Sequence, residues 1–325
     1  PVLSALANNG GYTQTMAISV TGAADDAADT TTADCAAIDQ RGTARPQGAA
    51  CDIGAYEVDD TGAPTLISFT LFNPATSPTN FDTLVFRATF SETVINVSAG
   101  DFQVDGTTTA TVTLVTPISG TVYEITVSGG DLATFNGAVG INLSGAQNIT
   151  DTVGNPVPAG EPATDETYIV DNTSPTVTID QALAQVDPTN VSPINFTVVF
   201  NEATTNFATG DVTLGGTAGA TTATVTGGPT TYNVAVSGMT GDGTVIATIA
   251  AGVATDAAGN NNAASTSTDN TVTYDTSGPI VTIGAPSATI TSAGPVNFPI
   301  TIADGTTFNL TVGDITIITT GTAPG

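Results

Sequence analysis

The residues of this sequence that could most clearly do chemistry are acidic residues that recur at a regular spacing. Asp60, Asp171 and Asp275 each begin a segment of Asp, three small or polar residues and Pro, and these starts lie 111 and 104 residues apart. Further acids recur in phase with them, namely Glu92, Glu202 and Asp304; Asp101, Asp211 and Asp314; and Asp151 and Asp256. Carboxylate oxygens are hard ligands that suit Ca²⁺, whereas zinc and copper prefer His or thiolate ligands, and the chain has no His. The sequence therefore predicts calcium as the metal that these eleven acids bind.

The same acids could instead serve as turn and cap residues. Asp-x-x-Gly-Asn is a good turn sequence by itself, so Asn155 and Asn260 could be left-handed turn residues rather than ligands. Asp101 and Asp211 could likewise be turn residues at the start of a strand. The metal hypothesis is favoured because the acids recur in phase without a basic residue nearby. Like charges ~4 Å apart would otherwise cost roughly 4 kcal/mol per pair at an effective dielectric constant of about 20.

The charge of the chain limits the partners that it can have. Arg41, Arg45 and Arg87 are the only basic residues against 30 acidic ones, and the formal net charge is −27. Such a surface repels nucleic acid and anionic membranes, so we expect neither as a partner. No apolar run approaches the ~20 residues of a membrane span, so direct membrane insertion is not expected. No catalytic constellation is visible, and we expect a protein that is not an enzyme.

The two cysteines, Cys35 and Cys51, lie in a polar, glycine-rich segment. In an exported protein such a pair predicts one local disulfide, and closing a loop of this size contributes roughly 3 kcal/mol through chain entropy. A redox or metal-binding pair is the alternative, but CxxC spacing and His are both lacking. We expect Arg41 and Arg45, in the same segment, to pair with nearby Asp side chains or backbone carbonyls.

The repeated acids are interspersed with segments that alternate as β-strands do. Apolar residues occupy alternate positions in Leu84–Phe90 and again in Ile194–Phe200, and the run Tyr123–Val127 recurs as Tyr232–Val236. Clusters of Gly, Pro, Asn and Asp separate such runs, which predicts about seven short strands per repeat. A composition dominated by Thr, Ala, Gly and Val also favours all-β structure. The repeat lengths suit an immunoglobulin-like sandwich.

Six segments of the second repeat carry a family resemblance: Thr176–Ile179, Ser192–Glu202, Phe207–Asp211, Val225–Thr226, Tyr232–Val236 and Ala254–Asn260. They resemble the bacterial immunoglobulin-like repeats of large surface and biofilm proteins. The resemblance implies β-sandwiches at residues 59–171 and 172–275 and a partial one at 276–325. It also implies a secreted, adhesin-like or fibre-forming protein.

Residues 1–58 differ from the repeats and hold both cysteines and two of the three arginines. The runs DQRG, RP and CDIGAYE within Asp39–Glu57, together with the NGG run of Leu6–Thr15, resemble the C-terminal end of right-handed parallel β-helix proteins of the pectate-lyase-like type. The resemblance implies that residues 1–58 are the last coil and cap of a longer β-helix. The predicted fold is thus all-β, with a β-helix C-terminal cap followed by tandem Ig-like β-sandwiches, the last one incomplete.

The sandwich topology would bring the acids of one repeat together. In Ig-like folds the loops between the second and third strands and between the last two strands cluster at one end. Glu202 lies on the first of these loops, Asp211 starts the strand that follows this loop, and Asp256 lies on the second loop. We therefore expect them to meet beside the joint residue Asp171, with the other repeats following the same plan.

These observations predict a structural, non-enzymatic segment of a long extracellular bacterial adhesin or fibre protein, secreted or displayed at the cell surface, with calcium stiffening its joints. Its partners would be further repeats or other copies of itself, and a surface glycan or protein receptor. Two alternatives stay open. One is a subunit of a polymerising filament that is completed by a neighbour's strands. The other is a carbohydrate-binding or polysaccharide-lyase-related surface protein.

Overall fold

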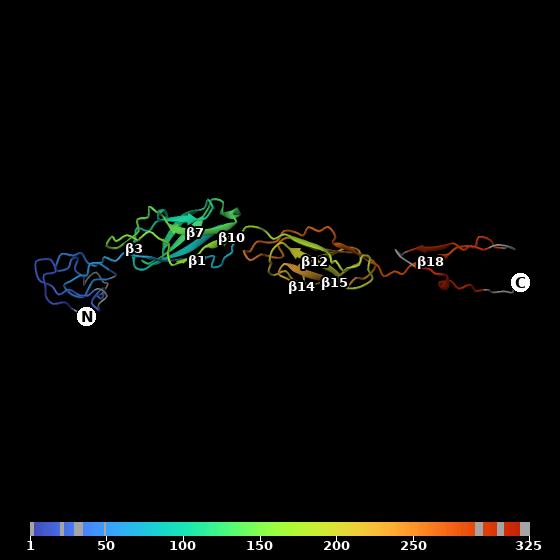
Figure 1. Cartoon of the computed structure of the whole chain (residues 1–325), viewed down its shortest axis with the longest axis horizontal. Coiled ribbons are helices and arrows are strands. Elements are labelled where there is room, and N and C mark those ends of the chain that lie inside the picture. The colour runs from blue at the N-terminus through green and yellow to red at the C-terminus, as the bar shows by residue number, and fades with distance from the viewer. Residues whose placement is uncertain are drawn as a thin grey trace. The chain divides into compact units, whose positions relative to one another are not determined.

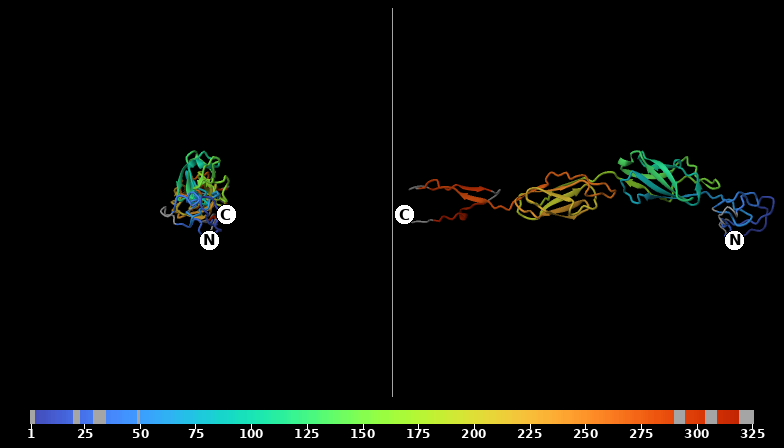
Figure 2. Two further views of the ribbon diagram at one scale, coloured as in Figure 1. Left: turned by 90° about the vertical axis from the view of Figure 1, so that its left-hand side faces the viewer. Right: turned by 180° about the vertical axis from the view of Figure 1, so that it is seen from behind.

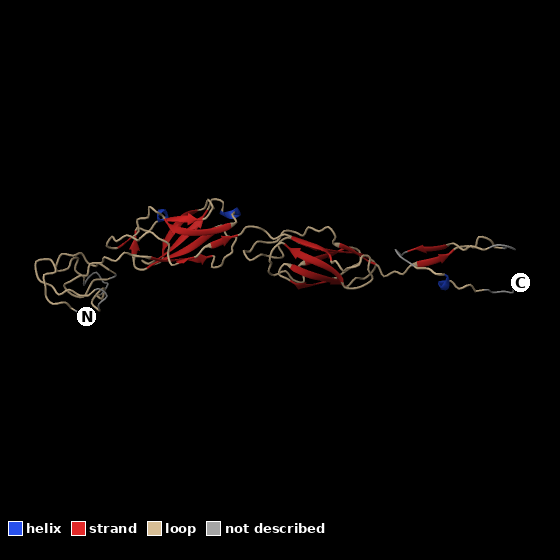
Figure 3. Ribbon diagram, in the orientation of Figure 1, coloured by secondary structure: helices blue, strands red, loops and turns tan. Residues whose placement is uncertain are grey.

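The structure is a computed structural model, and it describes residues 3–19, 23–28, 35–48, 50–289, 295–303 and 309–318. It is nearly all β, as the composition predicts, with loops connecting the strands (Figure 3). The chain divides into two compact units, Pro1–Pro175 with Ala203–Asn206 and Ala254–Asn262, and Thr176–Glu202 with Phe207–Val253 and Ala263–Gly325. Within the described ranges, no helix has the length and apolar character needed to cross a bilayer.

Two main sheets of the first unit lie within residues 66–170 (Figure 1). The elements in chain order are β1 (Leu66–Asn73), β2 (Thr83–Phe90), β3 (Val94–Ile95), the 3-10 helix η1 (Ala99–Asp101), β4 (Phe102–Asp105), β5 (Thr111–Pro117), β6 (Val122–Ser128), η2 (Leu132–Thr134), β7 (Gly137–Leu143), β8 (Thr150–Asp151), β9 (Thr164–Asp165) and β10 (Tyr168–Val170). One sheet has the order β5-β6-β2-β1-β9, the other has the order β10-β7-β4, and β3 pairs with β8.

The two sheets enclose one hydrophobic core, to which both contribute. Strand β2 presents alternate apolar residues to this core, as the sequence predicts, and Phe86 is completely buried. Phe86 contacts Tyr168 of the other sheet edge to face, with ring centroids 5.0 Å apart, and Phe69 contacts Phe102 at 6.2 Å. Both ring pairs join the two sheets, so the core lies between them.

The second unit repeats the same strand order. Its elements are β11 (Val177–Gln181), β12 (Ile194–Phe200), β13 (Val212–Gly215), β14 (Thr222–Gly227), β15 (Thr231–Ser237), β16 (Gly243–Ile249), β17 (Thr271–Tyr274), β18 (Ile280–Ile283), β19 (Ile300–Ala303) and the 3-10 helix η3 (Val312–Asp314). The sheets have the orders β11-β12-β15-β14 and β13-β16-β17, and the right-hand view of Figure 2 shows these strands from behind. The predicted alternation is confirmed here too, because Ile194, Phe196 and Val198 are fully buried.

Strands β18 and β19 form a separate antiparallel pair. Their register pairs Val281 with Ile302 and Ile283 with Ile300, and the side chains of Val281 and Ile283 are 54% and 64% exposed. The corresponding residues of the preceding repeat, Val177 and Ile179, are buried. This pair therefore has the strands of a repeat without an enclosed core among the described residues.

The described part of residues 1–58 contains no regular strand, and its polar groups are held by charged hydrogen bonds. Arg41 forms an ion pair of 2.8 Å with Asp39, and Arg45 forms one of 2.7 Å with the buried Glu57. Cys35 and Cys51 are joined in the predicted disulfide. The expectation that both arginines pair locally is thus confirmed.

Candidate metal centre

Pairing at the start of β1 brings the joint segment around Asp60 to the end of β2. Leu66 pairs with Phe90 in the β1–β2 ladder. Just before this pair, the Ser91 amide donates to the Thr65 carbonyl at 2.9 Å, and the Thr65 amide donates to the Ser91 hydroxyl at 2.8 Å. Glu92 follows directly after Ser91, so the backbone places it near the joint.

Asp151 reaches the same place from a distant part of the sequence. It ends the short strand β8, in which it pairs with Val94 of β3. Its Oδ1 accepts hydrogen bonds from the amides of Val153, Gly154 and Asn155 at 2.9, 2.6 and 2.8 Å, and its Oδ2 accepts one from the Asn155 side chain at 2.7 Å. These four donors fix the orientation of a carboxylate that is only 1% exposed.

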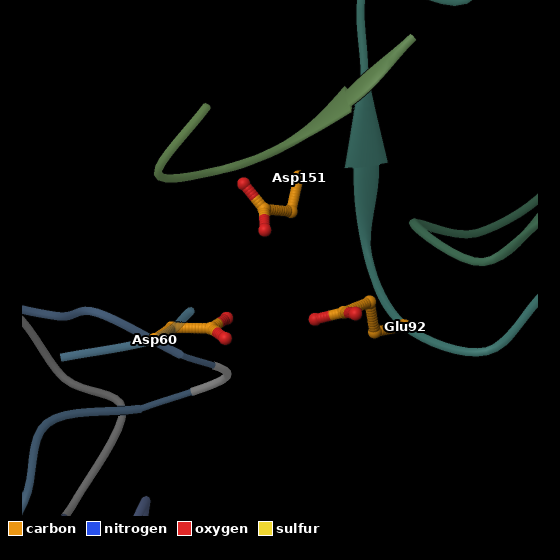
Figure 4. Close-up of side chains that lie close together, drawn as sticks. All are labelled: Asp60, Glu92 and Asp151. Atoms are coloured by element: carbon orange, nitrogen blue, oxygen red, sulfur yellow. The ribbon is translucent and has the colours of Figure 1, made fainter. Parts of the chain in front are cut away.

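Asp60, Glu92 and Asp151 form a group of three converging carboxylates, which Figure 4 shows. Each offers an oxygen, and the three oxygens all lie within 4.8 Å of one another. Asp60 and Glu92 are half-buried, and Asp151 is buried. The structure thus brings one acid from the joint and one from each of two loops into a single group, which could hold a metal ion.

The electrostatics of this group are unfavourable without a cation. Burial, and then the carboxylates of Asp60, Asp151 and Asp26, raise the pKa of Glu92 above its ordinary value. The three arginines of the chain form their ion pairs elsewhere, with Asp39 and Asp59, with Glu57 and with Glu124. No arginine that the structure describes forms an ion pair with Asp60, Glu92 or Asp151. A hard divalent cation fits such an all-oxygen donor set.

At the second joint, Asp171 and Asp256 repeat part of this arrangement. Glu202 is the sequence equivalent of Glu92. Asp171 and Asp256 belong to the same unit, and each offers a carboxylate oxygen within 4.8 Å of the other. Asp256 is buried, and its Oδ1 accepts from the Asn260 amide at 2.8 Å, as Asp151 Oδ1 does from Asn155. The acids of the two repeats therefore share a local design.

The other predicted ligands have separate positions or roles. Asp101 is buried, but its carboxylate accepts from the amide and hydroxyl of Ser98 at 2.7 Å and from the Asn148 amide at 2.9 Å. These bonds cap η1, which agrees with the alternative of a strand-start residue. Asp211 similarly accepts from the Ala208 amide at 2.7 Å.

The remaining predicted ligands belong to the third repeat. Asp275 accepts from the Ser277 amide at 3.0 Å, and Asp314 caps η3 through Thr311. Asp304 lies outside the described residues. Within the described ranges, the third repeat shows no group of three acids.

Two asparagines, Asn155 and Asn260, bridge the joint backbone and the neighbouring acid, a role that the sequence did not predict. Asn155 Nδ2 donates both to the Asp60 carbonyl at 3.1 Å and to Asp151 Oδ2 at 2.7 Å. Asn260 Nδ2 donates to the Asp171 carbonyl at 2.7 Å and to Asp256 Oδ2 at 2.9 Å. The left-handed residue of each loop is the preceding glycine, Gly154 or Gly259, and not the asparagine. The in-phase recurrence of these asparagines was the available signal, and each ties the joint backbone to the neighbouring acid.

An acidic pocket of ≈ 620 Å³ adjoins the first group. Asp60 and Glu92 line one part of it. Five acids from residues 25–59 also line it, namely Asp25, Asp26, Asp52, Glu57 and Asp59. Burial is the main reason that the pKa of Asp52 is raised. The proximity of Asp26 to Glu92 was not predicted, because the two are distant in sequence and no repeat relates them.

Comparison with known proteins adds little to this geometry. No family model and no curated protein matches the chain. Among solved structures, the adhesin InvE of Yersinia pseudotuberculosis is 15% identical over 65% of this chain and 58% of the adhesin chain, with a TM-score of 0.23. A chimeric titin Z1Z2 functionalised with an exogenous peptide from decorin is 11% identical over 64% of this chain and 98% of that chain, with a TM-score of 0.22. At these TM-scores, the function has to be inferred from the chain's own residues.

Proposed function

We propose that this chain is a structural, non-enzymatic segment of a long extracellular bacterial adhesin or fibre protein, in which calcium ions rigidify the joints between repeats. The observation that carries the proposal is the group of Asp60, Glu92 and Asp151. Three carboxylate oxygens lie within 4.8 Å of one another, while the arginines of the chain pair with other acids. A divalent cation would convert this repulsion into a link between the joint and two loops.

The donor set favours calcium over other metals. Ca²⁺ takes about six to eight oxygen ligands in flexible geometry, whereas Mg²⁺ demands near-ideal octahedral geometry. The three carboxylates come from a joint and two loops, so carbonyl oxygens and water would complete the shell. Asp60 and Asp151 are already oriented by hydrogen bonds from Gly62 and from residues 153–155. Asp60 and Asp151 are therefore held in place before the ion arrives.

The repeat architecture supports the structural role. When β3, β8 and β9 are set aside, the first two repeats have the same strand order. In one sheet of each repeat the strands lie in the order first, second, fifth, fourth, and in the other sheet they lie in the order third, sixth, seventh. This order agrees with that expected for an Ig-like sandwich, which supports the proposal. The disulfide between Cys35 and Cys51 supports an exported protein, because such bonds persist in oxidising surroundings. The β-helix cap assignment of residues 1–58 rests on the sequence resemblance.

Titration calorimetry of the chelator-treated chain tests the proposal. Calcium is expected to bind with a dissociation constant of about 10⁻⁴–10⁻³ M, the range of extracellular modules, and magnesium to bind more weakly. Glu92→Gln should remove the heat of the first joint, whereas Asp269→Asn, at an exposed acid of the second unit, should leave it unchanged. Chelation should also lower the melting temperature and increase bending in small-angle scattering. Absence of calcium binding, or equal binding by Glu92→Gln, contradicts the proposal.

A further inference from the structure

A Pro-Thr-Asn turn, Pro78–Asn80, lies next to the joint that follows the first repeat. It connects β1 to β2 in the chain. Thr79 forms a parallel bridge with Val170, and the Asp171 amide donates to the Thr79 carbonyl at 2.9 Å. The turn is therefore fixed to the last strand of its repeat and to the first residue of the joint.

The next residue of this turn, Asn80, contacts the Asp-x-x-Gly-Asn loop at 256–260, which belongs to the same unit. Its backbone amide donates to the Ala258 carbonyl at 3.2 Å, and its Nδ2 donates to Asn260 Oδ1 at 3.1 Å. A Cβ added at Gly259 would lie 3.6 Å from Asn80 Oδ1, so the glycine backbone packs directly against the asparagine amide. Asn80 therefore contacts the loop through both its backbone amide and its side chain.

Asn260 closes this arrangement into a network. Its Oδ1 accepts from Asn80, while its Nδ2 donates to the Asp171 carbonyl and to Asp256 Oδ2. Asn260 is only 8% exposed, so its amide group exchanges few of these bonds for water. The Asp171 amide in turn donates to Thr79. Turn, joint and loop are therefore connected through neutral hydrogen bonds and one carboxylate.

We propose that the Pro-Thr-Asn turn is a docking element for the Asp-x-x-Gly-Asn loop of the repeat that follows it, and that it holds this loop without a metal ion. The contacts of Asn80 with the loop involve no carboxylate, because their donors and acceptors are two amide side chains and two backbone groups. It gives the joint a fixed hydrogen-bonding register, whether or not calcium binds to the acids.

The same turn recurs at Pro188–Asn190 and supplies an internal reference. The Asp275 amide donates to the Thr189 carbonyl at 2.9 Å, as Asp171 does to Thr79. Asn190 is exposed and lines an open pocket with Asp275. Within the part of the chain that the structure describes, neither its amide nor its side chain has a hydrogen bond. This surface fits the Asp-x-x-Gly-Asn loop of another domain of the same kind.

Amide hydrogen exchange of the intact chain in chelator, followed by NMR, tests the proposal. The intrinsic exchange rate of an amide depends on its own residue and on the preceding one, and both Asn80 and Asn190 follow Thr. Their intrinsic rates are therefore matched. The Asn80 amide is expected to exchange at least about tenfold more slowly than the Asn190 amide. Asn260→Ala should remove most of this difference, whereas Asn155→Ala, at the equivalent asparagine of the first joint, should preserve it.

Three results overturn the proposal: equal exchange at Asn80 and Asn190, a difference that Asn260→Ala leaves intact, and a difference that exists only with calcium. The last result would make the docking a consequence of metal binding. Protection in chelator together with no calcium binding would instead refute only the calcium function. If Asn260→Ala disrupts the loop, melting temperatures decide. Asn80→Ala should lower the melting temperature of the first unit by about 2–4 °C, and Asn190→Ala should not.

Discussion

Replacing Glu92 by Gln should stabilise the first unit in chelator and destabilise it in calcium. The change removes one of three negative charges whose oxygens lie within 4.8 Å of one another. At that distance two unit charges repel by about 3.5 kcal/mol at a dielectric constant of about 20 and by about 0.9 kcal/mol in water. Asp60 and Glu92 are half-buried, so solvent screens the repulsion and the lower figure applies best.

Glu92 takes part in two of the three repulsive pairs of the group. Removing both should stabilise the metal-free unit by about 1–2 kcal/mol. A domain of this size changes its melting temperature by about 2–4 °C per kcal/mol, so the variant should melt about 2–8 °C higher in chelator. With calcium at about 100 times the dissociation constant, the wild type gains about 2.7 kcal/mol. That gain exceeds the relief of repulsion, so the wild type should then melt higher.

Differential scanning calorimetry in chelator and in calcium measures this reversal. Asp269→Asn serves as the matched control, because it also removes one negative charge, but from an exposed residue of the second unit. The control should shift the first-unit transition little and equally in both buffers. A Glu92→Gln variant that melts lower than the wild type in chelator would refute the repulsion. A variant that keeps the same sign in both buffers would refute the metal site.

Three further predictions concern pH, the core and the disulfide. In chelator, the stability of the first unit should fall as the pH rises from 4.5, the ordinary pKa of Glu92, to the raised pKa that Glu92 has in the folded state. In this pH range the folded state binds more protons than the unfolded state. Thermal melts should show a weaker pH dependence for Glu92→Gln than for the wild type. Tyr168→Phe should lower the free energy of unfolding in urea by about 1–3 kcal/mol, since it removes the hydroxyl that donates to the Pro74 carbonyl at 2.6 Å, whereas Ile169→Val, at a half-exposed neighbour, should change little. Reducing the bond between Cys35 and Cys51, which are 16 residues apart, should lower the stability of their segment by roughly 3 kcal/mol, as thermal melts with and without reductant can measure.

The strands were predictable because their signal is local. Side chains alternate between two faces with a period of two, so the apolar positions of Leu84–Phe90 and Ile194–Phe200 define the buried face directly. The prediction of about seven strands per repeat also agrees with the four-plus-three order that the two repeats share. The short pair β3–β8 escaped prediction, because strands of two residues carry no periodicity.

The grouping of the acids was predicted only in part. Topology placed Asp60, Glu92 and Asp151 at one end of the repeat, and the structure brings them together. Asp101 is close to Glu92 in sequence, but Ser98 and Asn148 engage its carboxylate. The residue type could not distinguish a ligand from a cap, because both roles use a short carboxylate and differ only in which donors surround it.

The hydrogen bonds of each acid indicate which one most strongly implies a cation. Asp151 accepts four hydrogen bonds from residues 153–155, which stabilise its charge whether or not a metal is present. Asp60 accepts one from the Gly62 amide. For Glu92 the described residues provide burial and three neighbouring carboxylates, all of which raise its pKa. The recurrence of Asp151 and Asp256 is therefore explained by their loops alone, whereas the position of Glu92 between two acids is what the proposed cation would explain. The joint residue and the loop acid define the site, and Glu92 is the residue whose charge tests it.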